Sequence, residues 1–249
     1  DESAGTMTLA QATAHSVNTI FAQVVTKVGP AKVAAVARAM GIESPLKTVC
    51  SITLGVNAVS PLDMADAYAT LAARGIHHPP QFIQTVRSAS GKVLFQLGRK
   101  GRRALPQRVA DLETLALRGV ITGGTGVAAN IGRPAAGKTG TGQNFQDAWF
   151  CGYVPQLTTC VWVGYPRAEI PMRNVEGFPE VFGGSLPAEI WHGFMSSVLA
   201  RVPVRNFAGV AGGPAPAPLA PAPTSSPTPT SPPVPSPSPS HKPHHRGHG

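Results

Sequence analysis

Apolar residues recur at helical intervals in the first half of the chain and near residue 190. Ile190, Phe194 and Val198 are spaced four residues apart, which places them on one stripe of an α-helix. Gly29-Pro30 is typical of a break at which one helix ends and the next begins. The predicted helices are 8–15, 19–28, 30–40, 60–75, 110–121 and 187–201.

Short runs of β-branched and aromatic residues predict strands. One hairpin is expected from 82–86 and 92–97, around the Ser88-Ala89-Ser90-Gly91 turn. Three more strands are predicted at 135–141, 147–153 and 157–164, followed by a loop up to the last helix. Helices followed by an antiparallel meander and a closing helix indicate an α+β fold, because a parallel sheet would alternate strands with helices.

Composition divides the 249-residue chain near residue 203. Half of the 26 prolines lie within 214–249, where large apolar side chains are scarce. Such a segment cannot offset its ordering entropy by burial. We therefore expect a folded domain over 1–203, and a disordered Pro/Ser/Ala-rich tail with a basic, His-rich end over 204–249.

The net charge of +9 suits an anionic neighbour, either nucleic acid or an anionic cell envelope. The densest basic run lies at 99–108 and has no interleaved aromatics, so it is interpreted as a solvated loop and no nucleic-acid partner is expected. The three cysteines form no C-x-x-C, and we expect neither a metal nor a cofactor. No apolar run reaches the ~18 residues of a membrane span.

Lys138 has two competing interpretations. Gly132 to Thr139 fits G-x-x-x-x-G-K-[ST], the phosphate loop of nucleotide-binding proteins. A phosphate loop needs a helix directly afterwards, and Thr-Gly-Thr-Gly-Gln-Asn cannot begin one. Thr122 to Gly126 (TGGTG) imitates a dinucleotide fingerprint but follows a predicted helix, and it is discarded as well.

The second interpretation is the K-T-G motif of enzymes that react with penicillin, formed by Lys138-Thr139-Gly140 on a predicted strand. Those enzymes also need S-x-N on the helical side of a cleft, and Ser16-Val17-Asn18 supplies it at a helix junction. Taken alone, Ser16 or Asn18 could equally cap a helix, and Lys138 could protect an edge strand from aggregation.

Five longer stretches carry a resemblance that makes these short motifs specific. They are MTLAQATAHSVNTIFAQV, SITLGVNAVSPLDMADAYATLAARG, TGVAANIGRPAAGKTGT, DAWFCGYVPQLTTCVWVGYP and FGGSLPAEIWHGFM. From about residue 5 to 202, the chain resembles the C-terminal two-thirds of the transpeptidase domain of class A (bifunctional) penicillin-binding proteins, of actinobacterial or mycobacterial type. The resemblance implies the penicillin-binding-protein and β-lactamase-like fold, with a helical subdomain beside an antiparallel sheet.

The resemblance also implies a serine acyl-transfer reaction on the D-Ala–D-Ala end of peptidoglycan stem peptides, which β-lactams mimic. Ser16 would then relay a proton and Lys138 would support it with positive charge. Asn18 would bind the substrate amide, and the Thr139 and Thr141 hydroxyls its carboxylate. The Thr141 backbone N–H would serve as an oxyanion donor, and Gly140 would let the substrate approach closely.

The implied setting is the outer face of the cytoplasmic membrane or the cell wall, with envelope and divisome proteins as candidate partners. The chain begins at Asp1 without Met, and we expect a membrane anchor in a preceding part.

The chain departs from the family pattern in one respect. The family's nucleophilic serine lies in S-x-x-K, upstream of S-x-N, and no such motif precedes Ser16. Ser44-Pro45-Leu46-Lys47 matches formally, but it follows S-x-N and does not continue as a helix. Two hypotheses result: a transpeptidase fragment that is inactive as this chain, or a non-catalytic module that binds peptidoglycan or an envelope partner.

Cys151 and Cys160 lie at equal distances from the Pro155-Gln156 turn. With a two-residue turn and no bulge, they oppose each other across an antiparallel pair, near the upper limit of separation for a disulfide. An oxidising compartment would permit the bridge, and a packed pair of thiols is the alternative. Cys50 is left as a free thiol.

We predict that this chain forms no covalent adduct with a fluorescent penicillin, because it has no S-x-x-K in the family's position. Denaturing gel electrophoresis after incubation with the label checks this. A labelled band that disappears in Ser44→Ala would contradict it.

Overall fold

The computed structural model describes residues 6–98 and 100–210, and they form an α+β arrangement. The α-helices are α1 (Leu9–Ala14), α2 (Asn18–Val28), α3 (Pro30–Met40), α4 (Pro61–Ala72), α5 (Gln107–Gly123) and α6 (Leu186–Val198). The strands are β1 (Ile76–His77), β2 (Thr85–Arg87), β3 (Val93–Gln96), β4 (Arg102–Arg103), β5 (Ala136–Thr141), β6 (Asp147–Val154), β7 (Leu157–Gly164), β8 (Arg173–Val175) and β9 (Phe178–Glu180). The predicted helices and the central meander are thus confirmed to within a few residues at each end.

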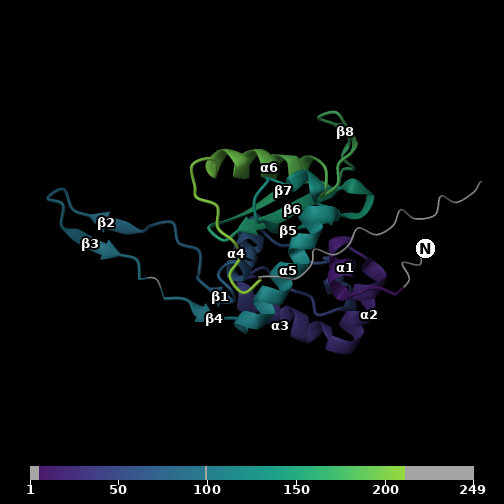
Figure 1. The fold of residues 1–249 in the computed structure, drawn as a ribbon, viewed down its shortest axis with the longest axis horizontal. Coiled ribbons are helices and arrows are strands. Elements are labelled where there is room, and N and C mark those ends of the chain that lie inside the picture. The colour runs from purple at the N-terminus through teal and green to yellow at the C-terminus, as the bar shows by residue number, and fades with distance from the viewer. Residues whose placement is uncertain (1–5, 99, 211–249) are drawn as a thin grey trace, which may run out of the picture. The chain divides into compact units, whose positions relative to one another are not determined.

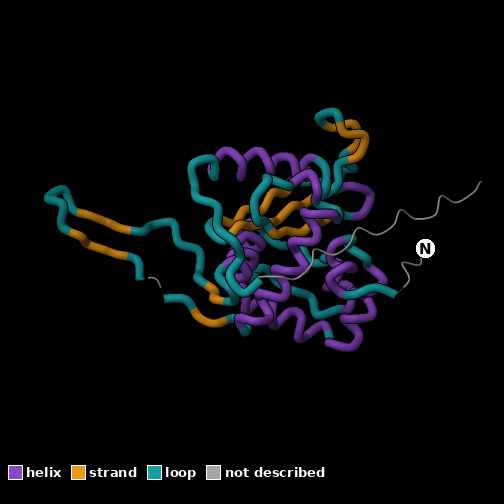
Figure 2. Tube along the Cα trace, viewed as in Figure 1, coloured by secondary structure: helices purple, strands orange, loops and turns teal. Residues whose placement is uncertain are grey.

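The central sheet is antiparallel, with strand order β5-β6-β7. Helix α6 covers one of its faces, and α4 and α5 cover the other, so the strands lie between two helical layers (Figures 1 and 2). Strand β5 is an edge strand of this sheet within the described part of the chain. Its second edge therefore has no paired strand among the described residues.

Two apolar clusters fix the sheet between these layers. On the α6 side, the Trp191 ring packs edge-on against Phe150 at 5.2 Å between ring centroids, and its indole N–H donates to the Thr159 carbonyl at 3.1 Å. On the other side, Tyr153 is fully buried, and its hydroxyl shares a hydrogen bond of 2.8 Å with Thr114 of α5. Both aromatic side chains thus bury their apolar body while their polar group keeps a partner.

The apolar stripe of α6 does not face the sheet. Ile190, Phe194 and Val198 are 45%, 47% and 44% exposed, whereas Trp191 and Met195 are fully buried. An apolar stripe at this spacing normally faces a core. Here the Trp191 and Met195 side chains fill the space over β6 and β7, so the stripe faces outward.

The sequence predicts a loop between β7 and the last helix, but the structure has two short strands in this segment. Strands β8 and β9 form a hairpin in which Val175 pairs with Phe178. Glu176 and Gly177 both have positive φ values, 49° and 83°, which a tight two-residue turn of this kind requires. A glutamate at such a position gives little sequence signal for the turn.

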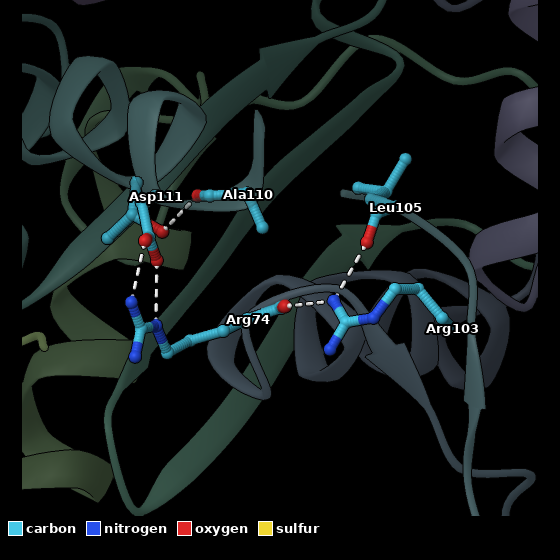
Figure 3. A network of polar contacts seen from close by, with 6 residues as sticks. Arg74, Arg103, Leu105, Ala110 and Asp111 are labelled. Atoms are coloured by element: carbon cyan, nitrogen blue, oxygen red, sulfur yellow. Dashed lines mark hydrogen bonds and ion pairs between the residues drawn. The ribbon is translucent and has the colours of Figure 1, made fainter. Parts of the chain in front are cut away.

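The basic run is also more ordered than a solvated loop. Arg102 and Arg103 form β4, which pairs with β1, and Arg103 donates to the carbonyl oxygens of Arg74 and Leu105 at 3.2 and 3.0 Å. Arg74 in turn makes two hydrogen bonds to Asp111 of α5, at 2.8 and 2.7 Å (Figure 3). This network connects the base of the segment that carries β2 and β3 to α5.

The β2–β3 hairpin lies apart from the helices and the central sheet (Figure 2). Its strands are shorter than predicted, because Thr85 pairs with the last strand residue, Gln96, and leaves Phe82 unpaired and 88% exposed. Beyond the expected domain boundary, Phe207 packs against Tyr153 at 5.6 Å between ring centroids. Residues 204–210 therefore contact the core, while the rest of the expected tail lies outside the described residues.

Membrane-spanning potential is limited in the part of the chain that the structure describes. No single helix there is long and apolar enough to cross a bilayer. Taken together, α2 and α3 have the length and apolar composition of a membrane span, but they are bent by 97° relative to each other.

The predicted register of β6 and β7 is confirmed: Cys151 pairs directly with Cys160, and their sulfur atoms are bonded in the structure. Cys50 is a free, exposed thiol. We expect non-reducing peptide mapping to show one link between Cys151 and Cys160 and one alkylatable cysteine, Cys50. Three alkylatable thiols in protein isolated without reductant would contradict the disulfide.

Candidate functional site: the contact between Ser16 and the Lys138 strand

Ser16 ends helix α1 in a strained conformation. Its φ of 56° lies in the left-handed region, where a side chain other than glycine is disfavoured. The N–H groups of Ser16 and Val17 return to the Thr13 and Ala12 carbonyls at 3.2 and 3.0 Å, which is the Schellman pattern of helix termination. Glycine usually occupies this position. A serine here therefore indicates that the side chain serves a purpose beyond ending the helix.

The Ser16 side chain meets Lys138 from the other half of the fold. Lys138 Nζ lies 2.8 Å from Ser16 Oγ, although 122 residues separate them. The same ammonium group donates to the Thr139 carbonyl at 3.1 Å and lies 3.4 Å from Thr139 Oγ1. Burial disfavours the charged form and lowers the pKa of Lys138 from 10.5 to about 8.

The hydroxyls of Thr139 and Thr141 already have protein partners. Thr141 Oγ1 accepts a hydrogen bond from the Gly183 N–H at 3.1 Å, so its own hydrogen remains free to be donated. Thr139 Oγ1 lies 2.6 Å from Thr125 Oγ1. The Gly183 backbone packs against the backbone of Gly140, where a side chain on Gly183 would overlap both Gly140 and Trp149.

Asn18 is the first residue of α2, and it is exposed. Val17 occupies the N-cap position, and no side chain caps this helix. The capping interpretation of Ser16 and Asn18 is therefore wrong. The edge-strand interpretation of Lys138 is also incomplete, because its ammonium group points to Ser16 and Thr139 instead of lying free in water.

Two glycine-rich segments, 122–126 and 183–184, also belong to this site, although neither contains a motif that predicts a role in it. A side chain at Gly124 would overlap the Ala14 carbonyl of α1, and one at Gly184 would overlap the Thr125 carbonyl. The Thr125 N–H donates to the Ala14 carbonyl at 3.0 Å. TGGTG was discarded as a nucleotide motif, but paired glycines next to a helix end were the available signal for close backbone contact.

The alternative motifs lack the structure that they need. Lys138 lies within β5 and is followed by β6, so no helix is placed to bind a phosphate. Ser44 Oγ accepts from the Ser60 N–H at 3.3 Å beside the start of α4, and residues 44–47 are not helical. Among the described residues, no group of three His, Cys, Asp or Glu side chains could hold a metal ion.

Comparison with known proteins gives one consistent result. The family model of the penicillin binding protein transpeptidase domain matches residues 1–171. Penicillin-binding protein 1A of Mycolicibacterium smegmatis is 36% identical over 90% of this chain, and that of Mycobacterium tuberculosis is 37% identical over 80%. The chain spans 32% and 27% of the length of these two relatives.

Solved structures agree with the sequence relatives. The PonA1 protein of Mycobacterium tuberculosis, in complex with penicillin V, superimposes with a TM-score of 0.75 at 36% identity, covering 83% of this chain and 60% of that one. Penicillin-binding protein 1A of Haemophilus influenzae, at 23% identity, shares the fold with a TM-score of 0.69. The Ser16–Lys138 contact is therefore part of a fold that is found among penicillin-binding proteins, and the chain belongs to the family of penicillin-binding-protein transpeptidase domains.

Proposed function

We propose that the chain forms the carboxylate-binding side of a D,D-transpeptidase active site that crosslinks the stem peptides of peptidoglycan. The observation that carries this proposal is the 2.8 Å contact between Lys138 Nζ and Ser16 Oγ. It brings the two short motifs together across the fold, with the cation beside the Thr139 hydroxyl on an edge strand. Neither a helix cap nor a solvated lysine explains that arrangement.

In the proposed reaction, a serine hydroxyl supplied from an upstream S-x-x-K segment attacks the carbonyl of the penultimate D-Ala. The peptide bond to the terminal D-Ala breaks, and an acyl-enzyme forms. The proton lost by the attacking hydroxyl balances the one that the leaving amine takes up through Ser16 Oγ, which lies within hydrogen-bond distance of Lys138. An amine of a second stem peptide then attacks the acyl-enzyme and forms the crosslink; the proton that this amine loses returns to the serine oxygen, which is released.

Lys138 would act mainly through its charge. With a pKa of about 8, it is largely protonated at neutral pH. The ammonium group would stabilise the terminal carboxylate of the acyl donor, which the free hydrogen of Thr141 and the hydroxyl of Thr139 would also bind. A β-lactam carries an equivalent carboxylate and would be held in the same way. Asn18, exposed at the start of α2, would bind the donor's amide.

The proposal assigns the chain half of an active site. Residues 6–210 contain no S-x-x-K in the family's position, so acylation requires a serine from elsewhere in the protein. The site would act outside the cytoplasmic membrane, where its substrate is assembled into the wall. The alternative is a binding module that holds stem peptides through the same cation and hydroxyls, without turnover.

To test the proposed function, we would compare variants in a form of the protein that carries an S-x-x-K segment upstream of residue 6. Lys138→Ala should lower the rate of acylation by benzylpenicillin by at least 10- to 150-fold, since hydrogen bonds to charged groups contribute about 1.5–3 kcal/mol. Lys27→Ala, which removes an exposed lysine of α2, is the control and should leave the rate unchanged. An undiminished rate in Lys138→Ala would exclude a role in acylation.

The partly buried ammonium group of Lys138 also predicts a pH dependence of stability. Because the pKa of Lys138 is lower in the folded chain than in the unfolded chain, folding releases a proton between about pH 8 and 10.5. The free energy of unfolding should therefore rise with pH through this window, by up to about 3 kcal/mol from this group. Urea unfolding at pH 7.5 and 10 should show a smaller rise in Lys138→Met. Equal changes in both proteins would contradict the lowered pKa.

A further inference from the structure

Thr125 connects the three segments that form the candidate site. It lies just beyond α5, and its N–H donates to the Ala14 carbonyl of the helix that ends at Ser16. Its own carbonyl is approached so closely by Gly184 that a side chain there would overlap it. Its hydroxyl lies 2.6 Å from Thr139 Oγ1 on β5. The backbone of Thr125 is thus fixed from two sides, and its side chain points to the edge strand.

The neighbours of the Thr139 hydroxyl restrict where its hydrogen can point. A threonine hydroxyl has one hydrogen to donate and two lone pairs that accept. Lys138 Nζ, which can only donate, lies 3.4 Å from Thr139 Oγ1. A carboxylate that binds to this strand can only accept. If Thr139 donated to Thr125, it would therefore turn a lone pair toward the bound carboxylate.

We propose that Thr125 is a positioning residue: it donates its hydroxyl hydrogen to Thr139 and thereby directs the Thr139 hydrogen toward the carboxylate of the acyl donor. With the ammonium group on one lone pair of Thr139 and the Thr125 hydroxyl on the other, the hydrogen of Thr139 is left for the ligand. This inference rests on the proposed function, because it needs a carboxylate to be bound at β5. Thr125 itself does not touch the reacting atoms.

A purely structural role for the side chain makes a different prediction. The backbone contacts of Thr125 with Ala14 and Gly184 do not involve its hydroxyl. Thr125→Val keeps these contacts and the shape of the side chain, but it removes the donor. If only packing mattered, Thr125→Val would change the rate of acylation by the same factor for every β-lactam. If the hydroxyl directs Thr139, only ligands with a free carboxylate should respond.

We would measure acylation rates in the form that carries an upstream S-x-x-K segment, with benzylpenicillin and with its methyl ester, which lacks the charge. Thr125→Val should lower the rate with the acid about 3- to 10-fold, the range expected for one hydrogen bond, and change the rate with the ester less than about twofold. Thr125→Ser retains the hydroxyl and should restore the ratio of the two rates. Thr26→Val is the matched control, because the exposed Thr26 hydroxyl lies on α2 and donates within its own helix, to the Gln23 carbonyl at 2.7 Å.

A double-mutant cycle tests whether Thr125 acts through Thr139. In a Thr139→Val background, Thr125→Val should cause no further loss with the acid. Thermal unfolding checks that the variants are folded; if Thr125→Val is not, Thr125→Ala compared with Thr125→Ser carries the same test. Equal losses with acid and ester, additive losses in the cycle, or no loss at all would overturn the inference while leaving the proposed function intact. A parent protein that forms no adduct with benzylpenicillin would overturn both.

Discussion

The partly buried ammonium group of Lys138 sets the constraint on which the arrangement of the site depends. A cation removed from water is costly unless its hydrogens find acceptors. The acceptors here come from two places: Thr139 beside it on β5, and Ser16 at the end of α1. The hydrogen bonds of the Lys138 ammonium group therefore hold the end of α1 against the edge strand β5 at one defined distance. That contact lies at the point where a bound carboxylate would gain most from a fixed positive charge.

Backbone contacts enforce the same geometry. Gly124 lies against the Ala14 carbonyl, Gly183 against Gly140, and Gly184 against the Thr125 carbonyl, each too close for a side chain. Packing of this kind leaves little freedom, because main-chain atoms cannot change rotamer as long side chains do. The walls of the candidate site are thus positioned by main chain, and the hydroxyls and the ammonium group project from them.

The sequence predicted those features that depend on local pattern. The Pro155-Gln156 turn gave the register that sets Cys151 opposite Cys160, and the residues after Lys138 excluded a phosphate loop. Features decided by tertiary packing were missed. The exposed face of α6 depends on how Trp191 and Met195 fit over the sheet, and the role of Thr125 depends on a contact with Thr139 that no spacing in the sequence encodes. The paired glycines next to Thr125 are visible in the sequence, but they match a dinucleotide-binding fingerprint more closely than any pattern of close backbone packing.

The left-handed Ser16 has a consequence for how this position can vary. A glycine would relieve the backbone strain at φ 56° and complete the Schellman motif as most helices do. Such a replacement would also remove the hydroxyl that accepts from Lys138, so the partly buried ammonium group would lose one of its acceptors. The backbone conformation and the hydrogen bond of the cation therefore favour different residues at position 16. Serine at this position keeps the oxygen beside Lys138 and accepts the strained backbone that glycine would relieve.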